Sequence, residues 1–210
     1  MNYHTYNTLG LVLGSAPSGE ASRYVYVFTK DLGLVGAHAQ NARNINSKLR
    51  YALDAPARSQ VSLVRGKNMW RLVSAIPDKR FYSVFRENPE KQQLCARTFS
   101  LIKKLLAGEE SNPELFSAIN EFLDFVAMEG KSRVGGDLVG ERNDACLDLK
   151  DIEAILVLRI LHFLGYIPEN DLTRQFAHSA GWNSEIVSAM TPRRREAIRI
   201  INESMRETGL

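Results

Sequence analysis

The hydrophobic pattern of this chain changes near residue 80, and the change divides the chain into two halves of different structure. Residues 1–80 contain five short runs rich in β-branched and aromatic residues, separated by turn residues. Residues 81–210 place apolar side chains three or four positions apart, as amphipathic helices do. We therefore expect an α+β protein, with a β-barrel domain over residues 1–80 and a helical-bundle domain over residues 81–210.

The five β-patterned runs predict a small closed sheet. We expect strands over residues 8–13, 23–29, 34–39, 60–65 and 69–75. A turn is expected over residues 14–20, and residues 66–68 are expected to close a hairpin between the last two strands. Five strands in so short a segment are typical of a Greek-key barrel such as the five-stranded OB-fold.

Helix caps and apolar spacing organise the second half. Asn88-Pro89 and Asn112-Pro113 each combine an N-cap side chain with proline at the first helical position, so a helix is expected to start at each. Residues 148–164 predict the central helix of the bundle, and residues 130–141 a mobile loop. Shorter helices are expected over residues 171–179 and 184–190, followed by a final helix capped by Thr191-Pro192.

Charge is divided unequally between the two halves. Residues 1–80 hold 11 Lys and Arg against 4 Asp and Glu, whereas residues 81–210 hold 16 against 20. A basic β-domain beside a mildly acidic helical one favours a polyanionic partner for the first half alone. The basic residues that we expect to meet phosphates are Arg23, Lys30, Arg43, Lys48, Arg50, Arg65, Lys67 and Arg71, with Arg58 as a further member.

Three aromatic side chains are candidates for stacking on bases: Tyr24, Tyr26 and Trp70. On the second strand the tyrosines share one face with Phe28, and two valines occupy the other face. The alternation leaves open which face is the core. The alternative for all of these residues is structural, because solvated β-surfaces are rich in Lys and Arg and because Tyr and Trp often fill small barrels.

A run of three arginines, Arg193, Arg194 and Arg195, is expected in the first turn of the final helix, where the helix dipole disfavours cations. Either Glu196, other nearby acids and water compensate the charge, or an acidic peptide or DNA phosphate binds there.

Other classes of function find little support. The chain has no Gly-rich phosphate loop, GxSxG elbow or HExxH motif, and Asp148, Asp151 and Glu153 are ordinary acids at a helix start, so we do not expect an enzyme. Four scattered histidines and two cysteines, Cys95 and Cys146, predict no metal site and a reducing, cytoplasmic setting. We expect neither a secretory signal nor a membrane span, since Arg159 and His162 interrupt the longest apolar run.

Residues 1–76 contain the string "GLVLGSAPSGEASRYVYVFTKDLGLVGAHAQNARNINSKLR" followed by a hairpin containing "LVRGKNMWRLVSA". With these motifs the segment resembles the amino-terminal OB-fold of the RecO family of DNA repair and recombination mediators. The helical half matches more loosely, through "LHFLGYIPE" at residues 161–169. The resemblance implies a protein that binds single- and double-stranded DNA, anneals complementary strands and assists recombinase loading with RecR. It also implies the acidic carboxy-terminal tail of single-stranded DNA-binding protein as a partner of the helical half.

Two departures from the family pattern are visible. RecO proteins commonly have a basic residue and a glycine where this chain has Gln40 and Asn41. Many also carry a four-cysteine zinc site after the Gly-Tyr-x-Pro segment, whereas residues 166–181 contain no cysteine. We therefore expect a short member of the family without zinc or another cofactor. The rival hypothesis is an OB-fold adaptor that binds an acidic protein or structured RNA and has no annealing activity.

Overall fold

The computed structural model describes residues 4–106, 108–128, 147–178, 181–207 and 209. The chain divides into two compact units, an amino-terminal unit of residues 1–116 and a carboxy-terminal unit of residues 117–210. The expected domain boundary after residue 80 stays a prediction. No described helix is both long enough and apolar enough to cross a membrane.

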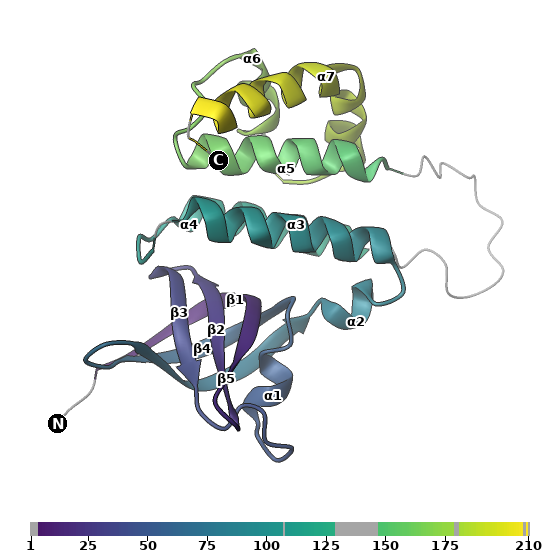
Figure 1. Ribbon diagram of the computed structural model, residues 1–210. Coiled ribbons are helices and arrows are strands. Elements are labelled where there is room, and N and C mark those ends of the chain that lie inside the picture. Colours follow the sequence, from purple (N-terminus) through teal and green to yellow (C-terminus); the bar gives the residue numbers. More distant parts are fainter. Residues whose placement is uncertain (1–3, 107, 129–146, 179–180, 208, 210) are drawn as a thin grey trace, which may run out of the picture. The chain divides into compact units, whose positions relative to one another are not determined.

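Five strands of the amino-terminal unit close into a barrel (Figure 1). Its neighbour order is β1-β2-β3-β5-β4, with β4 pairing back onto β1. β3 and β5 run parallel where they meet, and the other neighbours are antiparallel. The strands are β1 (Thr5–Ser18), β2 (Ser22–Thr29), β3 (Gly33–Ala39), β4 (Ala57–Arg65) and β5 (Trp70–Arg80). A five-stranded barrel followed by helices confirms the predicted α+β fold with an OB-fold at its amino terminus.

The first strand is longer than its sequence suggests. β1 continues through Ser18, so the expected turn over residues 14–20 is wrong and the chain reverses at residues 19–21. Pairing with β4 stops at Val12, and beyond that point β1 has β2 as its ladder partner. Proline is tolerated on a strand edge that needs no donor, so Pro17 does not end the strand.

The barrel core shows which face of β2 points inward, which the alternation of its residues leaves open. Val25 and Val27 are fully buried in the core, together with Val35, Ala37 and Ala39 of β3. The opposite faces of β2 and β3 therefore point out of the barrel, because successive side chains of a strand alternate between its two faces.

Short helices interrupt the connections of the barrel. α1 (Leu49–Ala52) lies in the connection between β3 and β4, which the sequence pattern presented as a polar loop, and it packs against β5. α2 (Tyr82–Phe85) follows β5, and α3 (Pro89–Leu105) follows α2. The predicted cap of α3 is present, because Asn88 Oδ1 accepts a hydrogen bond from the Lys91 amide at 3.1 Å.

The segment after α3 returns to the barrel. The Leu34 amide of β3 donates to the Gly108 carbonyl at 3.1 Å, and the Phe28 and Phe116 rings lie 5.5 Å apart. Phe28 is therefore buried although it points out of the barrel. Asn112 caps α4 (Pro113–Met128), as predicted, by accepting from the Leu115 amide at 2.9 Å, and the division between the two units falls within this helix.

The carboxy-terminal unit is built on α5 (Leu149–Phe163), whose predicted start is capped by Asp148. Arg159 of α5 is buried, and it donates hydrogen bonds of 2.9 Å to the carbonyls of Phe176 and Gly181. Its guanidinium lies 4.6 Å from the ring of Trp182. Burial lowers the pKa of Arg159 to about 10, so it remains protonated at neutral pH. This side chain ties the end of α6 (Asp171–Phe176) to the central helix.

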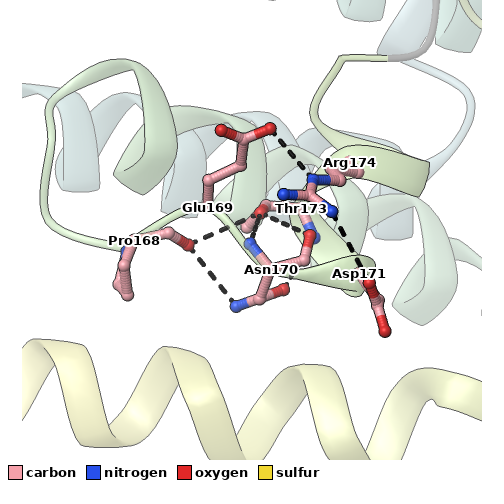
Figure 2. A network of polar contacts seen from close by, with 6 residues as sticks. All are labelled: Pro168, Glu169, Asn170, Asp171, Thr173 and Arg174. Carbon is pink, nitrogen blue, oxygen red and sulfur yellow. Dashed lines mark hydrogen bonds and ion pairs between the residues drawn. The ribbon is translucent and has the colours of Figure 1, made fainter.

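Local polar contacts start α6 (Figure 2). The Thr173 amide donates to Asn170 Oδ1 at 2.9 Å, and the Asn170 amide donates to Thr173 Oγ1 at 2.7 Å. This is a capping box, in which two helix-end donors are satisfied reciprocally. Arg174 adds an ion pair of 3.0 Å to Glu169. The helix ends at Phe176, before the end expected from sequence.

The last helix differs most from expectation. α7 (Ser184–Glu207) is one helix that contains Pro192, so the predicted break at Thr191-Pro192 is wrong. Asn183 caps it instead, accepting from the Ile186 amide at 2.8 Å. α7 packs along α5, and burial of its apolar face offsets the hydrogen bond that proline removes (Figure 1). The predicted loop over residues 130–141 lies outside the described residues.

Candidate nucleic-acid interface

A row of side chains crosses the outer face of the barrel. The β2–β3 register pairs Tyr24 with His38, and the β3–β5 register pairs His38 with Arg71. All three project away from the core, since their neighbours Val25, Ala37 and Trp70 are buried. Two rings and one guanidinium therefore lie side by side on strands 2, 3 and 5. Ligands of OB-folds commonly bind on the face of strands 2 and 3.

A second tyrosine extends this row. Tyr26 is 38% exposed, and its ring centroid lies 5.3 Å from that of Tyr24 in an edge-to-face contact. Gly36 makes room for the pair, because a Cβ at that position would stand 2.1 Å from the Tyr24 hydroxyl. The Tyr24 ring consequently lies close against the sheet. We name Tyr24, Tyr26, His38 and Arg71 the outer row.

Lys103 of α3 joins the outer row from outside the barrel. Its ammonium lies 5.7 Å from the centroid of the Tyr26 ring, within the range of a cation–π contact. Sequence reasoning missed Lys103, Gly36 and His38. His38 was recoverable, because it alternates with two small core residues on a predicted strand, whereas nothing local places a residue of α3 beside β2.

Four of the predicted cations lie near the turn between β1 and β2 and the α1 segment. The Arg43 amide donates to the Ala21 carbonyl at 2.8 Å, and its guanidinium donates to the Gly19 carbonyl at 3.4 Å. Arg23, at the start of β2, pairs with Asp54 at 3.5 Å. Lys48 and Arg50 lie at the start of α1, Lys48 exposed and Arg50 half-buried.

Asn41 shapes this connection, because it adopts a left-handed backbone with φ of 54°. Asn is among the few residues with a Cβ that tolerate this region at small cost. Glycine also fits there, so the residue that RecO proteins commonly carry and the one found here satisfy the same backbone requirement.

Two predicted cations lie at other turns of the barrel. Lys30 is exposed in the turn between β2 and β3. Lys67 is exposed in the predicted β4–β5 hairpin, which the Gly66 amide closes by donating to the Met69 carbonyl at 3.0 Å. Both side chains are therefore open to a ligand.

Acids of the amino-terminal unit pair with both predicted cations of β4. Arg65 at the end of the strand pairs with Glu109 at 3.2 Å, and Arg58 near its start pairs with Asp78 at 2.6 Å. Within the described residues, no carboxylate pairs with the side chains of Lys30, Lys48, Arg50, Lys67 or Arg71.

Trp70 is placed differently from the tyrosines. It is 6% exposed and belongs to the barrel core, where its ring meets that of Tyr6 at 5.3 Å. Its indole donates a 2.7 Å hydrogen bond to Glu109, and the Arg65 guanidinium lies 5.4 Å from its ring. A ring in this position offers no free face to a base, so Trp70 is omitted from the interface proposed below.

The three arginines of α7 lie in the interior of the helix and not in its first turn, which removes the dipole argument made from sequence. Arg193 pairs with Glu196 at 2.7 Å. Arg194 contacts Asp148 and lies 3.2 Å from the buried Asp151. Hydrogen bonds from the Lys150 amide and from Arg194 hold the pKa of Asp148 below its usual range. Acids of the same unit thus accompany two of the three arginines, and Arg195 is exposed.

No group of three or more His, Cys, Asp or Glu side chains among the described residues is arranged to hold a metal ion. The Cys95 thiol of α3 is buried, and burial raises its pKa to about 12, so it is protonated at neutral pH. This thiol is therefore a poor nucleophile and a poor metal ligand.

Comparison with known protein families supports the barrel assignment. A family model described as "Recombination protein O N terminal" matches residues 1–78. Residues 1–78 of this chain are therefore similar to the amino-terminal domain of RecO proteins. This match confirms the resemblance drawn from sequence, and the matched residues form nearly all of the barrel described above.

Relatives extend the RecO likeness into the helical half. The DNA repair protein RecO of Thermodesulfovibrio yellowstonii is 25% identical over 188 residues, covering 84% of this chain and 67% of the relative. That of Heliobacterium modesticaldum is 29% identical over 167 residues, covering 80% and 54%. That of Dehalococcoides mccartyi is 30% identical over 124 residues, covering 58% and 47%. The chain spans about half the length of several of the RecO relatives it matches.

Proposed function

We propose that this chain acts in DNA repair and that its barrel binds single-stranded DNA across the outer row. One observation carries the proposal: the registers of β2, β3 and β5 align Tyr24, His38 and Arg71 on the face that OB-folds use for ligands. Aromatic rings stack on any base, and an exposed guanidinium meets phosphate, so this surface suits a strand of any sequence. The relatives named DNA repair protein RecO support the repair role.

Charge supports the same surface. Residues 1–116 hold 16 Lys and Arg against 9 Asp and Glu, a net charge of +7, whereas residues 117–210 hold 11 against 15. We propose that Arg23, Arg43, Lys48 and Arg50 guide the sugar-phosphate chain at one side of the outer row, and that Lys30, Arg65 and Lys67 contact phosphates beyond it. Binding would release counterions and depend on salt accordingly.

We further propose the activities that the RecO resemblance implies: binding of double-stranded DNA, annealing of complementary strands, and assistance to recombinase loading with RecR. A surface that neutralises phosphates lets two strands approach each other, and base pairing then supplies the specificity. We propose the acidic tail of single-stranded DNA-binding protein as a ligand of the helical half, where Arg195 is exposed on α7.

A salt titration of single-stranded DNA binding tests the phosphate contacts. If about four phosphates are contacted, a plot of log affinity against log salt should have a slope of about −3. The triple variant Arg43→Ala, Lys48→Ala, Arg50→Ala should bind more weakly with a flatter slope. A control triple variant, Arg195→Ala, Arg199→Ala, Arg206→Ala, removes the same charge from α7 and should keep the slope. Equal slopes for wild type and the barrel variant would contradict the proposal.

The rival adaptor function predicts different ligands for the same surface. Anisotropy titrations with DNA, structured RNA and an acidic peptide, together with a strand-annealing assay, separate the two hypotheses. Tight binding of RNA or peptide without annealing activity would favour the adaptor. Faster annealing by the wild type, reduced in the barrel variant, would favour the mediator.

A further inference from the structure

A pocket of about 310 Å³ lies beside the barrel in the amino-terminal unit. It is formed by β1, the segment before β4, α2 and α3. Its volume is at the lower end of the roughly 300–1,000 Å³ typical of small-molecule sites, so it suits a single planar group. The proposed DNA-binding surface does not include this pocket.

The lining of the pocket is apolar at its base and polar at its mouth. Phe85 and Phe99 are buried aromatic walls, and Tyr82 is a half-exposed one. Exposed Gln92 and Ser100 place an amide and a hydroxyl at the opening. Aromatic walls with a few hydrogen-bonding groups are the surroundings that proteins provide for an unstacked nucleobase.

Lys103 is the charged residue in this lining, and no carboxylate of the described residues belongs to it. The same ammonium stands 5.7 Å from the Tyr26 ring of the outer row. One cation therefore lies between the tyrosine on which a base would stack and the mouth of the pocket. A phosphate on Lys103 would connect a nucleotide on Tyr26 with a nucleotide at the pocket.

We infer that the pocket receives one unstacked base of a DNA strand whose adjoining phosphate contacts Lys103. The base would lie among Tyr82, Phe85 and Phe99, with its polar edge towards Gln92 and Ser100. This inference rests on the proposed DNA binding by the outer row and adds a site for a base to it. The Cys95 thiol also lines the pocket. Because it is protonated at neutral pH, it places no negative charge beside the base.

The test fills the pocket without touching the outer row. Ala96 is exposed on α3 and lines the pocket, so Ala96→Phe would occupy the space of a base. Gln93→Phe adds the same ring at an exposed position of α3 that does not line the pocket. The full-length wild type and both variants are titrated with a thymidine oligonucleotide and with an abasic oligonucleotide of equal phosphate number. Thermal melting verifies folding of each variant.

Ala96→Phe should weaken binding of the thymidine oligonucleotide about tenfold, the effect of losing one stacked base, and leave abasic binding unchanged. Gln93→Phe should match the wild type on both probes. An equal loss on both probes, or no loss on thymidine, overturns the inference. Tyr26→Ala separates the two proposals: if it weakens binding while Ala96→Phe does not, the pocket alone is wrong. If the wild type binds neither probe, both proposals fail.

A peptide with acidic residues and an apolar end is a second probe of the pocket. Loss of peptide binding by Ala96→Phe with unchanged DNA affinity would overturn the base site and assign the pocket to a protein partner. Loss of thymidine binding with unchanged peptide affinity supports the base site.

Discussion

At the scale of single residues, Tyr26 and Trp70 have different roles, although the sequence offers both as candidates for stacking on bases. Both are aromatic residues of the barrel, but Tyr26 is 38% exposed and Trp70 is 6% exposed. The exposed ring can be lost without a cavity, whereas the buried ring cannot. Mutation should therefore affect DNA binding at one position and folding at the other.

Tyr26→Ala is expected to lower the affinity for single-stranded DNA by about 1–3 kcal/mol, the value of one base–aromatic stack, and to leave the melting temperature nearly unchanged. Trp70→Ala is expected to destabilise the barrel by about 3–5 kcal/mol. Anisotropy titration and chemical denaturation measure the two effects. Tyr26→Phe retains the ring and should bind like the wild type, and a loss equal to that of Tyr26→Ala would argue against stacking.

The Glu109 carboxylate is expected to compete with DNA phosphate for the Arg65 guanidinium. Its carboxylate lies 3.2 Å from the guanidinium and also accepts the hydrogen bond of the Trp70 indole. Glu109→Gln keeps an acceptor for the indole and frees the guanidinium for phosphate. We expect a steeper salt dependence of DNA binding, by about 0.7 in slope for one added contact. Glu110→Gln is the control, because it removes the same charge at a residue that does not pair with Arg65. If the salt slope changes equally in both variants, the change comes from net charge and not from release of Arg65.

At the scale of elements, α7 tolerates a proline in its interior because its apolar face is buried against α5. Proline removes a backbone donor and crowds the preceding turn. Pro192→Ala should therefore stabilise the carboxy-terminal unit by about 1–3 kcal/mol in chemical denaturation. Pro113→Ala is the matched control, since Pro113 occupies the first position of α4, where no donor is lost. Equal gains from both substitutions would contradict this explanation.

Helices and strands whose boundaries depend on nearby residues begin where the sequence predicts. The caps at Asn88 and Asn112 act within one turn of the chain, so the helix starts they predict are confirmed. Helices and strands whose boundaries depend on residues far away in the chain differ from the prediction. Pro17 and Pro192 look like breaks in isolation, but pairing with β2 extends one element and packing on α5 continues the other.

The candidate site divides in the same way. Exposed loop cations such as Lys48 and Lys67 follow from composition and turn residues. The outward face of β2 could not be chosen from sequence, because tyrosines and valines are both acceptable as core. Glu109 and Lys103 reach the barrel from segments outside its strands, and no local pattern predicts which strand residues they meet.

At the scale of the whole molecule, the barrel forms one compact unit with the segment that follows it, residues 81–116. Phe28 meets Phe116, the Leu34 amide bonds to the Gly108 carbonyl, and Trp70 bonds to Glu109. A fragment of residues 1–80 lacks all of these partners. It would expose a large aromatic side chain and leave an indole donor without its acceptor.

We therefore expect a fragment of residues 1–116 to unfold cooperatively and a fragment of residues 1–80 to melt at a lower temperature or to aggregate. Circular dichroism during heating compares the two fragments, and DNA titration tests whether residues 1–116 retain binding. Equal melting temperatures would show that the barrel is independent of its helices and would favour the boundary predicted after residue 80.

Gly36 has a consequence for how readily a strand can be captured. The bare backbone there leaves room for the Tyr24 ring close to the sheet, and that ring contacts the Tyr26 ring before any ligand arrives. A pre-organised platform spends little conformational entropy on capture. More of the stacking free energy then remains for holding the strand, and any side chain at position 36 would displace the ring on which this depends.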